Sequence, residues 1–413
     1  MDVRTSSLGT ATRLRDRRRA PWLARTATLG ALWLVGCGGG GGGAAPIPTG
    51  LVDGPIVGRV SASSATIAWR TGAPEVGRVE LGLDATYGDT ASEVSATTEH
   101  RVVLEGLGAD TTHHYRIAVA GGGDPEALAD HTVHTAPRDS GEHFRFAVVG
   151  DSGSGSPEES AIVELIDAAQ PELVLHTGDI AYGAGTNAQV EARFLAPYEP
   201  LLDHVPVYAS LGNHDAATDG GAPLLAATVL PTNDVDGSSH FYSYDWGGVH
   251  FVALDSNQSL APGSAQLAWL DADLAASSAD WRVLFFHHPP YSSSKHGSNE
   301  ALRAALTPVL DRHHVDLVFN GHDHDYERTL PMASGAVADP SLGPDYVDAA
   351  GTVFVVTGGG GQALYAAGAS AFTASSESSF HFVQVDVDGR ALAVTAIRID
   401  GSVLDRFSLA KAG

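Results

Sequence analysis

The sequence has few of the residues that mark several common protein classes. Its single cysteine, Cys37, excludes a disulfide within the chain, and lysine occurs only at positions 295 and 411. The net charge is −25, so the chain is a poor match for nucleic acid or another polyanion. An anionic substrate would therefore need local positive charge, of the kind that bound metal ions supply. The apolar run at residues 26–36 is too short to span a bilayer.

The first 50 residues predict an export signal followed by a tether. Residues 1–37 hold seven Arg against two Asp and end in Leu-Val-Gly-Cys, which resembles a bacterial lipoprotein cleavage box. Acylated Cys37 would then anchor an otherwise extracytoplasmic protein to the membrane; the alternative is an ordinary secretory signal with an incidental cysteine. Residues 38–50 form a Gly-rich tether. The Arg run at 17–19 leaves the twin-arginine export route open.

Residues 51–137 predict an all-β domain. Alternating runs at residues 65–70 and 115–119 are separated by Gly, Asp and Pro. The stretch 107–115 resembles the turn before a late strand of fibronectin type III domains, in which a Tyr hydroxyl bonds back to the upstream backbone. Trp69 fits the core of an earlier strand, and no metal-ligand cluster falls in this part. We therefore expect a fibronectin type III-like domain here, although another β-sandwich would fit the same pattern.

Residues 143–413 predict an α/β domain. Buried strands are expected at 144–149, 173–176, 205–211, 281–286 and 315–319, a hairpin at 241–254, and closing strands at 353–357, 382–387 and 391–399. Ser156, Pro157 and Glu159 predict a helix start with a capping box. Leu stripes beginning at 267 and 302 predict two further helices. Strand, motif and helix in repeated order is an α/β layout, and such folds build their sites at the carboxyl ends of strands.

Five short polar motifs follow these apolar runs. They are Gly-Asp-Ser-Gly at 150–153, Gly-Asp-Ile-Ala-Tyr at 178–182, Gly-Asn-His-Asp at 212–215, His-His-Pro-Pro-Tyr at 287–291 and Gly-His-Asp-His at 321–324. Together they supply carboxylate, phenol, amide and imidazole groups sufficient for two metal ions. Two ions about 3.5–4 Å apart can clamp the attacking and leaving oxygens of a phosphoryl transfer. One such motif is weak evidence, whereas five at strand ends are strong.

The motifs resemble those of the purple acid phosphatases, within the calcineurin-like metallophosphoesterases. The closest likeness lies in residues 179–182 and in Gly-His-Asp-His-Asp-Tyr-Glu-Arg at 321–328, and the resemblance covers nearly all of the chain after the signal. It implies a metallophosphoesterase β-sandwich flanked by helices, preceded by the fibronectin type III-like domain. It also implies one ion held by Asp151, Asp179, Tyr182 and His324. The other ion would be held by Asp179, Asn213, His287 and His322.

The donor types fit a mixed-metal centre. A phenolate and two carboxylates are hard anionic donors that suit Fe(III), whereas two imidazoles and an amide suit Zn, Mn or Fe(II). Taken singly, Asp151 or Asp179 would more often be a turn residue and Tyr182 a packing residue. His288 is an alternative to His287 as the ligand; the family pattern favours His287, which stands two residues before the first Pro.

Three further residues are candidates for work on the substrate. His214 follows Asn213, and Asp215 could orient its ring, as a carboxylate often does for a working imidazole. The resemblance places a substrate-contacting histidine nine residues after His287, which is His296 here. A surface histidine is the alternative for His296.

These features predict an acid phosphatase that hydrolyses small phosphate monoesters, with a metal-bound hydroxide as nucleophile. His296 or His214 would protonate the leaving alkoxide. Two other functions stay open: a phosphodiesterase or nucleotidase on the same scaffold, and a surface binding protein with a vestigial metal site. The intact ligand set disfavours the second.

Overall fold

The computed structural model describes residues 51–118, 129–139, 141–340 and 343–412. The predicted export signal (1–37), with Cys37, and the tether (38–50) lie outside the described residues. All of the described residues belong to one compact unit, Ile47–Gly413. The boundary between a domain at 51–137 and a domain at 143–413 therefore stays a prediction. Within the described residues, no helix combines the length and apolarity needed to cross a membrane.

The N-terminal part consists of two antiparallel sheets, as the alternating pattern predicts. One holds β1 (Leu51–Gly58), β2 (Ser64–Glu75) and β5 (Thr97–Glu105). The other holds β4 (Asp89–Ser92), β3 (Arg78–Gly82), β6 (Thr112–Ile117) and β7 (His131–His134). Trp69, Leu104 and Tyr115 are buried between them. Period-two alternation places such side chains on one face of each strand, which is the face that packs.

The expected bond from Tyr115 to the upstream backbone is wrong. The Tyr115 hydroxyl donates to the carbonyl of Asp203, 88 residues later in the chain, at 2.5 Å. His131, on the neighbouring strand β7, also contacts the Asp203 carboxylate at 3.0 Å. A buried hydroxyl bonds to the carbonyl that packing brings within reach, and here that carbonyl comes from the α/β part.

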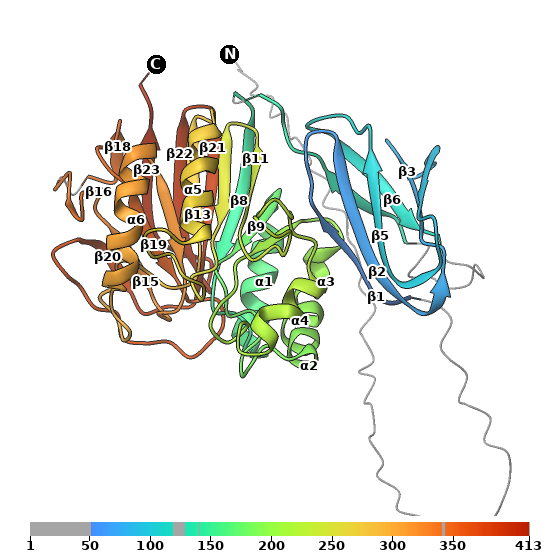
Figure 1. Cartoon of the computed structure of the whole chain (residues 1–413), viewed down its shortest axis with the longest axis horizontal. Coiled ribbons are helices and arrows are strands. Elements are labelled where there is room, and N and C mark those ends of the chain that lie inside the picture. The colour runs from blue at the N-terminus through green and yellow to red at the C-terminus, as the bar shows by residue number, and fades with distance from the viewer. Residues whose placement is uncertain (1–50, 119–128, 140, 341–342, 413) are drawn as a thin grey trace, which may run out of the picture. The chain divides into compact units, whose positions relative to one another are not determined.

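The α/β part is built on two large sheets that face each other (Figure 1). The first, in spatial order, contains β10 (Val207–Ala209), β9 (Leu173–His176), β8 (His143–Val149), β21 (His381–Asp388), β22 (Ala391–Arg398), β23 (Val403–Ala410) and β18 (Asp345–Val347). The second contains β11 (Tyr242–Trp246), β12 (Val249–Ala253), β13 (Trp281–Phe285), β14 (Leu317–Asn320), β19 (Val353–Thr357), β15 (Tyr326–Thr329) and β20 (Thr373–Glu377). A short pair, β16 (Met332–Ala333) and β17 (Ala336–Val337), stands apart.

Parallel pairing brings the motif-bearing strand ends to one edge of each sheet. β8, β9 and β10 are parallel neighbours, and so are β12, β13, β14 and β19. Phe146 of the first sheet meets Phe251 and Phe319 of the second edge-to-face, with ring centroids 5.2 Å and 6.4 Å away. These contacts lock the two sheets face to face, so both sets of strand ends face the same side of the molecule.

Helices cover the outer face of each sheet. Ile162, Val163 and Ile166 of α1 (Pro157–Ala169) join Tyr198 and Leu201 of α3 (Ala196–Leu202) over the first sheet. The second sheet is covered by Leu stripes of α5 (Ala265–Ala276) and α6 (Glu300–His313) (Figure 1). The remaining helical segments are α2 (Asn187–Val190), a π-helical turn at Glu191–Leu195, a 3-10 turn at Asp219–Gly221 and α4 (Ala222–Ala227). The result is the mixed α/β fold that the sequence predicts.

The start of α1 differs in one detail from the predicted capping box. Ser156 Oγ accepts the amide of Glu159 at 3.2 Å, as expected for an N-cap. The Glu159 carboxylate, however, accepts the amide of Gly155 at 2.7 Å instead of that of Ser156. The Ser156 amide is already engaged, since it donates to Ser154 Oγ at 3.2 Å.

A buried histidine links the β11–β12 hairpin to α5 and gives the fold a pH dependence. His250 contacts Asp245 at 2.7 Å and Asp273 at 2.8 Å. Burial opposes its charge, but the hydrogen bonds to the two carboxylates outweigh burial and raise the pKa of His250 to about 9. In an unfolded chain the pKa of His is about 6.5. The stabilisation of the folded state by the charged His250 is therefore complete below pH 6.5 and is lost as the pH rises to about 9.

We expect the urea concentration at the unfolding midpoint to decrease as the pH rises from 6.5 to 9. We expect the His250→Gln variant to lack this decrease. Measuring the midpoints of both proteins across that window tests this expectation. An identical pH trend in the two proteins would show that the His250 pairs contribute nothing.

Candidate metal centre

All seven predicted ligands lie just beyond the carboxyl ends of strands. Asp151 follows β8, Asp179 and Tyr182 follow β9, Asn213 follows β10, His287 follows β13, and His322 and His324 follow β14. The structure brings all of them together, since each contacts at least one other member of the set. The two parallel strand groups explain this convergence.

One half of the cluster contains Asp151, Tyr182 and His324. The Tyr182 hydroxyl donates to Asp151 Oδ1 at 2.9 Å and lies 2.9 Å from His324 Nε2. His324 Nδ1 donates to the carbonyl of Ala363 at 2.8 Å. A neutral imidazole has one N–H, so this bond leaves the lone pair of Nε2 facing Asp151, 3.5 Å away. A carbonyl partner of this kind is typical of histidines that bind metals.

The other half contains Asp179, Asn213, His287 and His322. His287 Nδ1 donates to the carbonyl of Thr177 at 3.1 Å, which leaves Nε2 with a lone pair. Around that nitrogen lie Asn213 Oδ1 at 3.0 Å, His322 Nδ1 at 3.2 Å and Asp179 Oδ2 at 3.4 Å. Several acceptor atoms thus converge on one point, and a cation would satisfy all of them. Asp151, Asp179 and His287 also offer ligand atoms within 4.8 Å of one another.

The backbone at these positions is strained. Asp151, Asp179 and His322 have φ values of 57°, 56° and 72°, in the left-handed region that side chains other than Gly rarely adopt. Such conformations persist where the surrounding structure enforces them, and they cluster at functional sites. Two glycines of the ligand loops allow the crowding: a Cβ on Gly212 would lie 2.0 Å from Asp179 Oδ1, and one on Gly321 would lie 2.4 Å from Asp151 Oδ2.

The electrostatics of the cluster fit a cation. Burial raises the pKa of Asp179, and the neighbouring Asp151 charge raises it further. Burial also raises the pKa of the Tyr182 phenol well above its usual range. Burial lowers the pKa of His322 to about 2, which keeps that ring neutral and able to bind a metal. Buried carboxylates are costly unless they are paired or coordinate metals.

His214 lies beside the centre. Its backbone N–H donates to Asp179 Oδ1 at 2.8 Å, and its ring centroid is 4.6 Å from that of Tyr182. Its Nδ1 contacts the carbonyl of Gly183 at 3.0 Å, while Nε2 lies 4.0 Å from Asp179 Oδ2. The ring is thus oriented by a backbone carbonyl.

The prediction that Asp215 orients the His214 ring is therefore wrong. The buried Asp215 carboxylate accepts the backbone amides of Ala181 (2.9 Å), Gly212 (2.9 Å) and Ile180 (3.1 Å and 3.2 Å). A carboxylate removed from water binds the donors that surround it, and here those are the amides of the two ligand loops. Asp215 holds the loop of Asp179 against the loop of Asn213.

His296 lies at the edge of the centre. Its ring centroid is 4.2 Å from that of His322 and 5.5 Å from that of Tyr365. Its backbone N–H donates to Asp323 Oδ1 at 2.8 Å, and Asp323 Oδ2 accepts the Ser292 hydroxyl at 2.5 Å. The loop of His296 is thus tied to the loop of the predicted ligands. A cavity of about 530 Å³ opens here, lined by His288, Pro289, His296, Gly297, Ser298, Asn299, Glu300 and His322.

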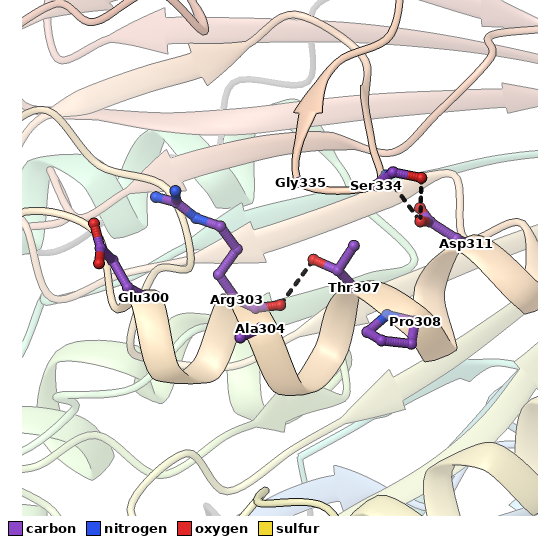
Figure 2. Close-up of a pocket in the computed structure, with 8 residues that line it drawn as sticks. All are labelled: Glu300, Arg303, Ala304, Thr307, Pro308, Asp311, Ser334 and Gly335. Carbon is purple, nitrogen blue, oxygen red and sulfur yellow. Dashed lines mark hydrogen bonds between the residues drawn. The ribbon is translucent and has the colours of Figure 1, made fainter.

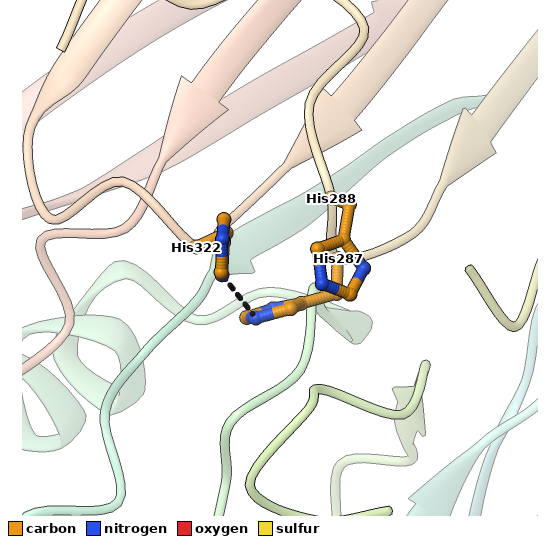
Figure 3. A group of neighbouring side chains, drawn as sticks. All are labelled: His287, His288 and His322. Atoms are coloured by element: carbon orange, nitrogen blue, oxygen red, sulfur yellow. Dashed lines mark hydrogen bonds between the residues drawn. The ribbon is translucent and has the colours of Figure 1, made fainter. Parts of the chain in front are cut away.

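Figure 3 shows His288 next to His287 and His322. The three rings offer nitrogen atoms within 4.8 Å of one another, so His288 could also hold a metal by proximity alone. Only His287, however, reaches Asn213 and Asp179, whereas His288 Nδ1 is engaged by the Ser256 hydroxyl at 2.8 Å. The geometry therefore favours His287 as the ligand.

Sequence reasoning missed two groups next to the centre. Asp255, Ser256 and Asn257 follow β12, and Asn257 Nδ2 donates to the carbonyl of Gly212 at 3.3 Å. A polar triplet after an apolar run is the same signal as in the five motifs and could have revealed this sixth one.

Tyr365 stacks on His324 with a centroid distance of 4.0 Å, and Lys295 Nζ lies 4.0 Å from the Tyr365 ring centroid. No local pattern marks Tyr365.

A second cavity lies away from these residues. It measures about 670 Å³ and runs along α6, where Thr307 Oγ1 donates to the carbonyl of Arg303 at 2.7 Å (Figure 2). It is lined by Glu300, Arg303, Ala304, Thr307, Pro308, Asp311, Ser334 and Gly335. None of the predicted ligands reaches it, so the smaller cavity beside those ligands is the better candidate for substrate.

Comparison with known proteins finds similar sequences. Residues 144–326 match the calcineurin-like phosphoesterase family. Purple acid phosphatase 15 of Arabidopsis thaliana is 31% identical over 64% of this chain and 53% of its own length. Purple acid phosphatase 22 of that plant is 32% identical over 60% of this chain and 57% of its own length. The chain thus spans little more than half the length of these two relatives.

Solved structures share the fold. A purple acid phosphatase from yellow lupin (Lupinus luteus) seeds aligns over 86% of this chain and 74% of its own, with a TM-score of 0.77 and 20% identity. PhoD aligns over 89% of this chain and 93% of its own, with a TM-score of 0.60 and 13% identity. These likenesses establish the mixed α/β metallophosphoesterase fold.

Proposed function

Since this chain carries a calcineurin-like phosphoesterase domain and is homologous to the purple acid phosphatases, we propose that it is a metal-dependent phosphomonoesterase. The observation that carries the proposal is the orientation of the His287 and His324 rings. Backbone carbonyls hold Nδ1 of each ring, so in the neutral ring each Nε2 has a lone pair beside a buried carboxylate. Imidazole nitrogens beside buried carboxylates are an arrangement that suits a bound cation.

The residues at the site fit two ions of different character. Asp151, Asp179, Tyr182 and His324 would hold Fe(III), which prefers hard anionic oxygens. Asp179, Asn213, His287 and His322 would hold Zn, Mn or Fe(II), with Asp179 shared between the two ions. When bound, the ions supply positive charge for the phosphate and lower the pKa of water.

The protein's own side chains would then bind the substrate and move the proton. His214 and His296 flank the cluster from two different loops and contact Tyr182 and His322 by their rings. Neither belongs to the ligand set, so each is free to hydrogen-bond a phosphate oxygen. His296 also lines the cavity in which a leaving group would lie, and it is therefore the better placed proton donor.

Comparing two substrates that share a leaving group tests the function. We expect the metal-loaded protein to hydrolyse p-nitrophenyl phosphate faster than bis(p-nitrophenyl) phosphate. A preference for the diester would favour a phosphodiesterase on the same scaffold. Failure to hydrolyse either compound with two metals bound would favour a binding protein.

The β-rich part and the N-terminus carry further proposals. We propose that residues 51–137 form a fibronectin type III-like domain, which an experimental structure with a different strand order would contradict.

We also propose that Cys37 is acylated and anchors an exported protein. Stable anchoring requires more than one acyl chain. We expect Cys37→Ser to leave the membrane fraction or to remain unprocessed; unchanged fractionation would favour a simple secretory signal.

A further inference from the structure

The cavity beside the metal cluster has a third imidazole that no proposed role yet uses. His288 is half-buried and lines this cavity together with His296 and His322. Its ring centroid lies 4.6 Å from that of His322 and 5.0 Å from that of His287 (Figure 3). The His288 ring thus lies beside the predicted ligands and lines the cavity next to them.

The orientation of His288 is fixed by the loop that follows β12. Ser256 Oγ contacts His288 Nδ1 at 2.8 Å and accepts the backbone N–H of His288 at 3.1 Å. The neighbouring Asp255 carboxylate accepts the backbone amide of Asn257 at 2.9 Å, which rigidifies the loop. One hydroxyl therefore holds both the ring and the backbone of His288.

This anchoring is compatible with a donor role for the second ring nitrogen, Nε2. The Ser256 hydroxyl accepts from the backbone of His288, so its proton is available to Nδ1. In that arrangement the neutral ring has its N–H at Nε2, the nitrogen that Ser256 does not engage. An imidazole N–H at this position is a donor for an anion, whereas a metal ligand needs a lone pair there.

We propose that His288 is a further substrate-binding residue, which donates Nε2–H to a phosphate oxygen of the ester and of inorganic phosphate. The proposal rests on the proposed phosphomonoesterase function. It assigns the metals to His287 and His322 and leaves His288 as a hydrogen-bond donor in the cavity that it shares with His296. Ser256 then acts as a positioning residue through His288.

A matched pair of substitutions tests the position of the donor. Gln places its amide near Nε2 of the original ring, whereas Asn places it near Nδ1, within reach of Ser256 only. We expect His288→Asn to raise KM for p-nitrophenyl phosphate and the Kd for inorganic phosphate by about 10- to 100-fold, the span of one hydrogen bond to a charged group. His288→Gln should recover much of this loss. Both variants should keep the metal content of the wild type.

Three results would overturn the proposal. Loss of one metal ion per chain in both variants would make His288 a ligand. Equal effects of Asn and Gln would show that Nε2 is not the donor, and unchanged phosphate binding in both would remove His288 from the site. Calorimetric binding of inorganic phosphate to the metal-loaded chain needs no turnover. A wild-type protein that binds phosphate but hydrolyses no ester would thus refute the proposed function, while the phosphate affinities of the two variants would still decide the role of His288.

Discussion

Asp179→Asn is expected to lose bound metal and nearly all turnover. The Asp179 carboxylate lies between the two halves of the cluster, 3.4 Å from His287 Nε2 and with an oxygen within 4.8 Å of an Asp151 oxygen. An amide of the same shape offers one neutral oxygen where two ions would share a charged group. Outer-shell changes at metal sites typically cost 10- to 100-fold, so removing a shared ligand should cost more than about 100-fold.

The backbone conformation at Asp179 accommodates Asn without added strain. Its φ of 56° is left-handed, a conformation that Asn tolerates as well as Asp does. Asp348, which is exposed and has a φ of 50°, provides the matched control. We expect Asp348→Asn to keep full metal content and activity. Two bound metals and near-normal turnover in Asp179→Asn would refute the shared-ligand assignment.

His296→Ala is expected to slow alkyl phosphates far more than aryl phosphates. Alkoxides leave poorly without a proton, whereas phenolates of acidic phenols need little help, so a lost proton donor affects mainly the first group. General acid catalysis typically contributes about 10²- to 10⁴-fold. Steady-state rates with glycerol phosphate and with p-nitrophenyl phosphate measure the difference, and the metal content should stay unchanged.

His143→Ala provides the control, because the His143 side chain is 61% exposed at the start of β8, the far end of the strand from the site. An equal loss on both substrates would assign His296 to phosphate binding. No loss on either would return it to a surface role and leave His214 as the candidate proton donor.

The sequence predicts the parts of this molecule that depend on local pattern. Apolar runs followed by polar motifs predict β8, β9, β13 and β14, and parallel pairing then brings Asp151 and His322 together. The helical segments at 187–202 escape this reasoning. Pro197 and Pro200 disfavour a helix there, and a π-helical turn shifts the register of the buried side chains.

Contacts between distant loops are the other part that sequence reasoning could not reach. Asp215 looks like a partner for the adjacent His214, yet its acceptors bind amides that are supplied 34 and 35 residues earlier in the chain. Ser256 lies 32 residues before His288, which it orients. Tyr115 likewise bonds to Asp203 because of packing across the molecule. Such partners are set by how strands pair, and no spacing along the chain encodes them.

Titrating the metal-free full chain with iron and a divalent ion, while following hydrolysis of p-nitrophenyl phosphate, tests the central claim most directly. The two-ion assignment predicts that one equivalent of metal per chain gives little turnover and that activity rises to a plateau at two equivalents. Full activity at one equivalent, or a protein that binds two ions and hydrolyses no monoester, would contradict it.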